Sequence, residues 1–285
     1  MPIKSVLKKT GTLLKGTFTE FVADNALRLS AALSCYILFS LTPLLIIIIS
    51  LCGIFFGEQA VRGEVFDQIN GLVGIRAATQ IEETIKTVKL STGITITKTL
   101  GVIVTLIAAS GVFAEMRSAL DGMWKIQSKN GNSMIKFVIE RLFSFAIIGS
   151  TGLLLFIGLF INLLMDILNN QLIVYLPWFD INFYYLVNLI VLFVLLIIFF
   201  TVIFRILPSG QMSLLNCFIG AFFTAVLFMI GKFAMGTYFG RLAVTSIFGT
   251  AGTLLLILTW IYYSAIIFYL GAEFTKVYAR TVGKK

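Results

Sequence analysis

The chain has 285 residues, of which 59% are hydrophobic and only 12% are charged. A soluble domain has about 45–50% apolar and about 25% charged residues, so this sequence has too few polar side chains to cover a surface in water. Its net charge of +9 comes from Lys and Arg placed between apolar runs and at both ends of the chain. This placement indicates membrane orientation and attraction to anionic lipid headgroups, and it argues against a nucleic-acid partner.

Several kinds of chemistry are excluded by composition and spacing. Histidine is absent, which removes the commonest general base and the commonest metal ligand. Cys35, Cys52 and Cys217 lie inside apolar runs without disulfide or metal-binding spacing. A phosphate-binding loop is also lacking, so the chain would not hydrolyse ATP itself. We therefore expect no enzyme, no metal site and no cofactor.

Apolar segments dominate the chain in sequence order. Residues 1–28 are basic with apolar residues between the charges, and they predict an amphipathic helix in the cytoplasmic headgroup region. Six apolar segments follow, each near or above the roughly 20 residues that cross a bilayer. The predicted spans are residues 31–57, 95–114, 142–166, 182–205, 212–237 and 247–273.

The remaining segments set the orientation. Residues 58–93 have mixed charge and glycine breaks, and they predict outer amphipathic helices. Residues 276–285 are predicted to be a basic cytoplasmic tail. With six spans, the cytoplasmic segments carry more than twice as many Lys and Arg as the outer ones, as the positive-inside rule requires. The sequence thus predicts an all-α, polytopic membrane protein with six transmembrane helices, interfacial helices and both termini cytoplasmic.

Four stretches of the chain resemble a known family. They are Asn25-Ala26 with Ser30-Ala31-Ala32-Leu33-Ser34-Cys35-Tyr36 and Phe39-Ser40-Leu41-Thr42-Pro43-Leu44, then Ala119-Leu120-Asp121-Gly122-Met123-Trp124, then Arg205-Ile206-Leu207-Pro208, and finally Trp260-Ile261-Tyr262-Tyr263-Ser264 with Leu270-Gly271-Ala272-Glu273-Phe274. With these, residues 18–278 resemble the YihY/virulence factor BrkB family of bacterial integral membrane proteins, once labelled ribonuclease BN. The resemblance implies six spans in a bacterial plasma membrane and movement of lipids or other solutes across it. Family members often have asparagine where this chain has Asp121.

Charged and polar residues gather near the predicted inner ends of the spans. A charge facing lipid is costly, so such groups need partners, a wet cavity or an interfacial position. An arginine suits phosphate because its planar guanidinium donates two parallel hydrogen bonds. The substrate-path candidates are Arg28, Ser34, Tyr36, Pro43, Arg117, Arg141, Arg205, Tyr262 and Glu273. The alternative is a ring of salt bridges that only fixes helix ends.

Three carboxylates, Asp24, Glu115 and Glu273, are candidates for proton coupling if an ion gradient drives transport. Near the predicted outer ends, Asp166 and Lys232 could pair, and snorkelling of Lys232 to the headgroups is the simpler alternative. The first predicted span contains several hydroxyls before Pro43, which fits either a kinked packing helix or a hinged helix lining a polar path.

Small residues four positions apart are typical of close helix packing in membranes. The pattern occurs at residues 236–240, 249–253 and 110–114, and we interpret these residues as sites where helices pack against each other.

Two functions of different classes follow. The first is a transporter or flippase-like protein that moves a lipid or another amphiphilic, anionic solute, and it predicts a polar cavity among spans one, three, four and six. The second is a structural or assembly protein that binds partners through the outer segment, and it predicts a tightly packed bundle. Membrane lipids with anionic headgroups are the expected partners.

Overall fold

The computed structural model describes residues 3–57, 111–126, 181–210, 212–241 and 244–282, with scattered positions between 59 and 83. Its long elements are α1 (Ile3–Ala23), α2 (Ala26–Phe56), a helix over 111–123, α7 (Ile181–Ile206), α8 (Leu214–Arg241) and α9 (Val244–Thr281). No strand occurs in these ranges, and the predicted all-α class is confirmed.

Three of the described helices are long and apolar enough to cross a bilayer. The qualifying segments are Leu189–Ile206, Leu214–Met235 and Leu254–Thr281. A fourth is counted if Gly11–Ala23 and Ala26–Leu41, which meet at an angle of 67°, form one broken span. The predicted span 142–166 and most of 95–114 lie outside the described residues. The count of six spans and the sidedness of the termini therefore stay predictions.

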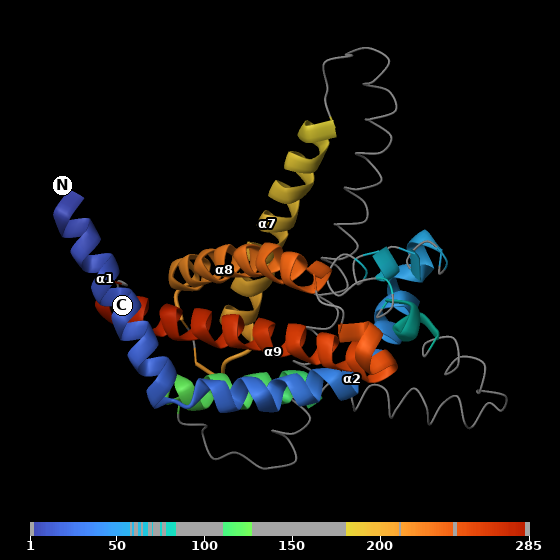
Figure 1. Cartoon of the computed structure of the whole chain (residues 1–285). Helices are drawn as coiled ribbons and strands as arrows, with labels where there is room; N and C mark the ends of the chain where they lie inside the picture. Colours follow the sequence, from blue (N-terminus) through green and yellow to red (C-terminus); the bar gives the residue numbers. More distant parts are fainter. Residues whose placement is uncertain are drawn as a thin grey trace.

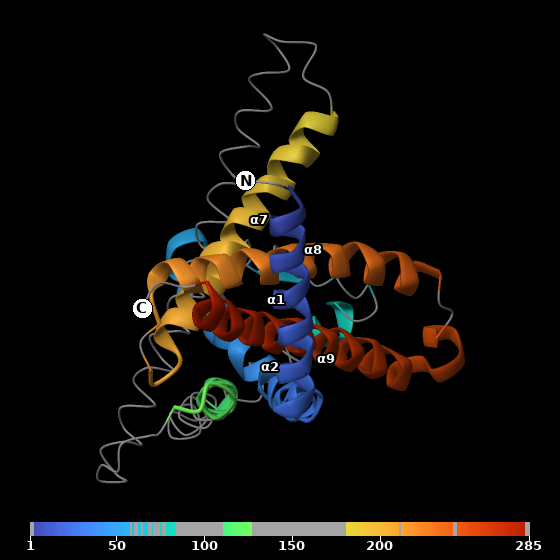
Figure 2. The ribbon, with the colours of Figure 1, turned by 90° about the vertical axis from the view of Figure 1, so that its left-hand side faces the viewer.

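Helix α9 lies at the centre of the arrangement, because it contacts α1, α2 and α8. Figures 1 and 2 show α8 on one side of α9 and α2 on the other, with the helix over 111–123 running alongside α2. Helix α7 packs on α8. Helix α1 lies across the C-terminal end of α9, so the N-terminal helix and the last helix contact each other (Figure 1).

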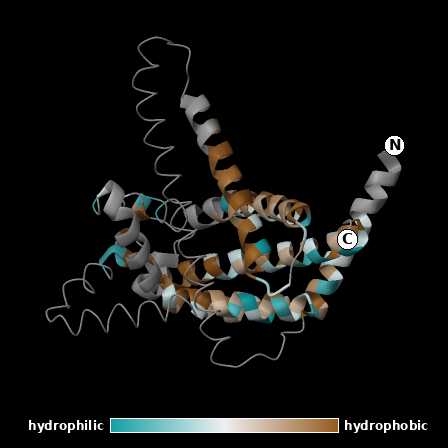
Figure 3. Cartoon of the chain, turned by 180° about the vertical axis from the view of Figure 1, so that it is seen from behind, coloured by the Kyte–Doolittle hydropathy of each residue, from teal (hydrophilic) through white to brown (hydrophobic). Residues whose placement is uncertain are grey.

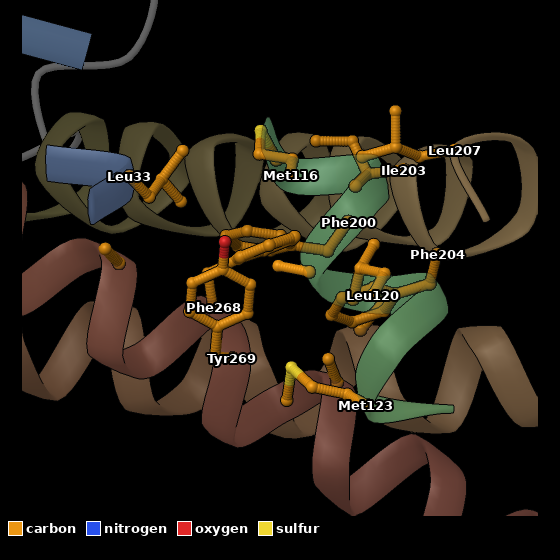
Figure 4. Close-up of a cluster of buried hydrophobic side chains, with 14 of the residues drawn as sticks. Leu33, Met116, Leu120, Met123, Phe200, Ile203, Phe204, Leu207, Phe268 and Tyr269 are labelled. Carbon is orange, nitrogen blue, oxygen red and sulfur yellow. The ribbon is translucent and has the colours of Figure 1, made fainter. Parts of the chain in front are cut away.

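The core consists of large apolar side chains from α7, α9 and the helix over 111–123 (Figure 4). The rings of Phe204 and Phe268 stack with centroids 5.6 Å apart, and Phe200 stacks on Phe268 at 6.4 Å. Leu120 and Met123 fill the space beside them and are buried. This aromatic cluster fixes where α7 and α9 meet.

Helix α7 leaves most of its apolar surface uncovered. Only 22% of the segment Leu189–Ile206 is buried, and the coloured part of α7 is largely brown in Figure 3. Such a surface needs lipid or other apolar groups around it, which fits the predicted span over these residues.

Helices α8 and α9 meet through a reciprocal pair of glycines and threonines. A Cβ built on Gly220 would lie 1.8 Å from Thr275 Oγ1, and one on Gly271 would lie 1.9 Å from Thr224 Oγ1. Each threonine hydroxyl donates to the glycine carbonyl one turn earlier in its own helix, at 2.7 Å in α8 and 2.8 Å in α9. We call these four residues the helix crossing. It follows the small-xxx-small rule, but at positions that the sequence reading did not select.

The turn between α1 and α2 depends on one backbone conformation. Asn25 has φ 52°, its N–H donates to the Val22 carbonyl, and its own carbonyl accepts from Arg28 and Leu29. It therefore ends one helix and begins the next, while its side chain is exposed. Among residues with a side chain, asparagine adopts this left-handed conformation most readily.

We expect Asn25→Ala to lower the free energy of unfolding by about 1 kcal/mol, because alanine is strained at positive φ. Asn25→Gly should stay within about 0.5 kcal/mol of the parent protein. Thermal unfolding of the two variants in one detergent compares them directly. If Asn25→Gly is less stable than Asn25→Ala, the asparagine side chain matters and the argument from the positive φ angle is wrong.

Candidate functional site

A buried lysine holds three carboxylates together where α1 meets α9. Lys276 is 1% exposed, and its Nζ lies 2.7 Å from Glu20 Oε2, 2.6 Å from Asp24 Oδ2 and 3.0 Å from Glu273 Oε2. We call Glu20, Asp24, Glu273 and Lys276 the charged joint. It connects residues more than 240 positions apart in the chain.

Helical spacing places the groups of the charged joint. Glu20 lies on the face of α1 toward α9 and Asp24 follows it by four positions, just past the helix end. Glu273 and Lys276 are three positions apart on α9. The helices can approach here because Gly16 has no side chain: a Cβ there would lie 3.2 Å from Val277 Cγ1.

Lys276 keeps the two N-terminal carboxylates of the joint ionised. The hydrogen bond from Lys276 lowers the pKa of Glu20 below its ordinary value. Burial by itself would raise the pKa of Asp24, but the hydrogen bond and the positive charge of Lys276 outweigh it, and the pKa is lowered. Both groups lie outside the predicted spans and are negative at neutral pH.

The three carboxylates have one oxygen each within 4.8 Å of the others, which is close enough to hold a metal ion. The Lys276 ammonium already lies 2.6–3.0 Å from these oxygens, where a metal ion would meet its positive charge. The arrangement is therefore an ion-pair cluster.

A second polar contact holds the turn after α7. Asp121 accepts a hydrogen bond from the Ser209 backbone N–H at 2.7 Å and another from the Ser209 hydroxyl. Arg117 donates to the same hydroxyl at 3.1 Å. Asp121 thus works here as an acceptor, a role that one amide oxygen of asparagine could share only in part.

The predicted path residues on α2 are dispersed along it. Arg28 is exposed, and Tyr36 is 46% exposed. Ser34 is buried and donates to the Ala31 carbonyl of its own helix at 2.8 Å, which fits packing better than an open polar path. Pro43 lies inside α2, which continues to Phe56.

The other candidates lie on several elements. Glu115 lies in the helix over 111–123, Arg205 in the last turn of α7, and Tyr262 on α9, all partly buried. Lys232 is partly buried on α8, and its predicted partner Asp166, like Arg141, lies outside the described residues. Of the predicted site residues, the structure brings Asp24 and Glu273 together.

Sequence reasoning missed Glu20 and Lys276. The predicted tail begins at residue 276, but α9 continues to Thr281 and Lys276 is buried within it. Charge counting missed Lys276 because it treats every terminal lysine as exposed. The spacing of Glu20 with Asp24 and of Glu273 with Lys276 was a readable signal for two matching helix faces.

An apolar groove of about 310 Å³ lies between α7 and α8. Its lining is Leu189, Ile190 and Phe193 of α7 with Val226, Met229, Ile230 and Phe233 of α8. It is not the polar cavity that the transport hypothesis predicts.

Long apolar helices whose buried charges are paired where α1 meets α9 define an α-helical membrane protein. Residues 17–285 match the family model described as Virulence factor BrkB, and the chain belongs to this family. The resemblance seen in the sequence is thereby confirmed. No curated protein and no solved structure matches the chain.

Proposed function

We propose that this protein moves a lipid or another amphiphilic, anionic solute across the bacterial plasma membrane, without hydrolysing ATP itself, and that it is not an enzyme. The observation that carries the proposal is the charged joint. In it, α1 is held on the last helix by ion pairs in place of apolar packing alone.

Ion pairs of this kind favour a contact that opens and closes. Replacing a buried ion pair by apolar groups of similar volume is often neutral or stabilising, so a joint of four charged groups is a poor choice for stability alone. Its carboxylates can instead be rehydrated, since Glu20 and Asp24 are 32% and 18% exposed. We propose that α1 acts as a latch at the cytoplasmic end, that is, a helix that detaches from α9 and binds it again.

The outer face of α1 supports a position at the lipid surface. Leu14, Phe18 and Val22 are four positions apart, and they are 46%, 65% and 57% exposed. They form one apolar stripe facing away from α9, while Lys15 beside them is exposed. An amphipathic helix with this pattern lies in the headgroup region and favours anionic lipids.

A proteoliposome assay tests the proposal. We expect the purified protein to move a fluorescent phosphatidylglycerol between leaflets faster than protein-free vesicles do, and to move a phosphatidylcholine analogue more slowly. Lys276→Met, in α9, should change the rate, whereas Lys15→Met, at an exposed lysine of α1 outside the charged joint, should not. Rates equal to those of empty vesicles for several headgroups would refute transport of lipids. That result would favour the alternative, a structural or assembly protein. Deletion of residues 59–90 would then test the alternative, because it should abolish binding of the partner.

A further inference from the structure

We infer that the charged joint holds one exchangeable proton, shared between the carboxyl groups of Glu273 and Asp24. This names the coupling ion of the proposed transporter, and in that role it rests on the proposed function. The presence of the proton itself rests only on the geometry.

Charge balance gives the first argument. The joint contains three carboxyl groups and one ammonium, and their oxygens lie within 4.8 Å of one another. Arg280, 3.7 Å from Glu20 Oε1 and half exposed, balances Glu20, and Lys276 balances Asp24. Glu273 then has no cation of its own, although it is 0% exposed. A buried carboxylate beside other carboxylates, with no cation of its own, favours its protonated form.

The hydrogen bonding of Glu273 gives the second argument. Lys276 Nζ donates to Glu273 Oε1 at 3.3 Å, whereas Oε2 is buried, lies 3.0 Å from the same Nζ and accepts no hydrogen bond from the described residues. A protonated carboxyl group carries an O–H donor, and the acceptor beside it is the carboxylate of Asp24. A buried oxygen that accepts no hydrogen bond is destabilising, and a proton on Glu273 turns it into a donor toward Asp24.

The groups that face Glu273 come from each neighbouring element. Helix α1 and the turn after it provide Glu20 and Asp24, and α9 provides Lys276 and Arg280. Lys125, which follows the helix over 111–123, adds a positive charge that acts on Asp24. Each cation among these described neighbours also acts on another carboxylate of the joint, so Glu273 has none to itself.

Asp24 is the route by which the proton leaves. Its side chain is 18% exposed, whereas that of Glu273 is fully buried. The O–H bond of Glu273 breaks as an O–H bond forms on Asp24, and Asp24 then passes the proton to water. The net change is one proton released and one negative charge left in the joint. That charge repels Asp24 and weakens the hold of α9 on α1.

Infrared spectroscopy of the protein in lipid nanodiscs measures the proton without any transport assay. A protonated carboxyl group has a C=O stretching band that a carboxylate lacks. We expect the parent protein at neutral pH to show this band, to the extent of one buried carboxyl per chain, and to lose it at alkaline pH. Glu273→Gln should abolish the band at neutral pH.

Two further variants separate the outcomes. Glu115→Gln, at another carboxyl on the helix over 111–123, should leave the band unchanged. Asp24→Asn should move its loss to lower pH, because the neighbouring negative charge is gone. A band at neutral pH that survives Glu273→Gln, or no such band in the parent protein at neutral pH, overturns the inference. If the band depends on Glu273 but the protein moves no lipid, the inference of a shared proton holds and only the proposed function is refuted.

Discussion

Replacing Lys276 by methionine is expected to lower the free energy of unfolding by about 3–5 kcal/mol, which is typical when one partner of a buried ion pair is removed. Methionine fills a similar volume but leaves Asp24 and Glu20 beside buried Glu273 with no ammonium among them. Mutual repulsion of the carboxylates should release α1 from α9, while α8 and α9 stay packed through their own contacts.

Hydrogen exchange followed by mass spectrometry shows whether the effect is local. Amides of α1 (Ile3–Ala23) should exchange faster in Lys276→Met, and those at the helix crossing should be unchanged. Lys15→Met should leave both regions and the melting temperature unchanged. Combining Lys276→Met with Asp24→Asn removes both charges of one pair and should restore much of the stability. Equal loss of protection in α1 and α9 would mean that Lys276 supports the whole fold and not a latch.

Adding one methyl group at the helix crossing is expected to destabilise the protein by about 1–3 kcal/mol or more, the usual range for overpacking. In Gly271→Ala the new Cβ would lie 1.9 Å from Thr224 Oγ1 and 2.9 Å from Thr224 Cβ. Turning the threonine side chain does not relieve the crowding, because Thr224 Cβ stays 2.9 Å from the added Cβ in every rotamer. The helices must therefore separate.

Unfolding in detergent and a second substitution test this prediction. Thr224→Ala removes the closest atoms, so Gly271→Ala with Thr224→Ala should be more stable than Gly271→Ala alone. Gly220→Ala should behave like Gly271→Ala, because its Cβ would lie 1.8 Å from Thr275 Oγ1. The matched control is Gly11→Ala in α1, where no atom lies within 4 Å of the added Cβ. Equal stability of Gly271→Ala and Gly11→Ala would show that α8 and α9 are not this close.

Apolar run length predicted the ends of two helices with different accuracy. Apolar run length predicted a span over residues 182–205, and α7 extends over Ile181–Ile206, one residue further at each end. The last span was predicted to end at residue 273, whereas α9 ends at Thr281. Run length stops at the first charge, and a helix does not, because a buried partner allows a charged residue to remain inside it.

The candidate site was predicted in part. Asp24 and Glu273 were selected because charge near a span is costly, which is a property of each residue alone. Their contact, and the roles of Glu20 and Lys276, depend on how α1 folds back at Asn25 and on which side of α9 it lands.

The same distinction applies to packing. The small-residue pattern occurs at many places in an apolar sequence, and the sequence reading selected residues 236–240, 249–253 and 110–114. The close approach described above uses Gly220, Thr224, Gly271 and Thr275, because only the crossing of two helices decides which small residues meet.

The sequence by itself determined that this is a membrane protein and to which family the chain belongs. Composition and run length are sums over the chain, and they do not depend on which residues touch. Only the tertiary structure decided that α1 and α9 meet at a buried lysine with three carboxylates around it. Ion pairing falls off over a few ångströms, so it is set by the bend at Asn25 and by the path of α1 across α9, which no single stretch of residues specifies.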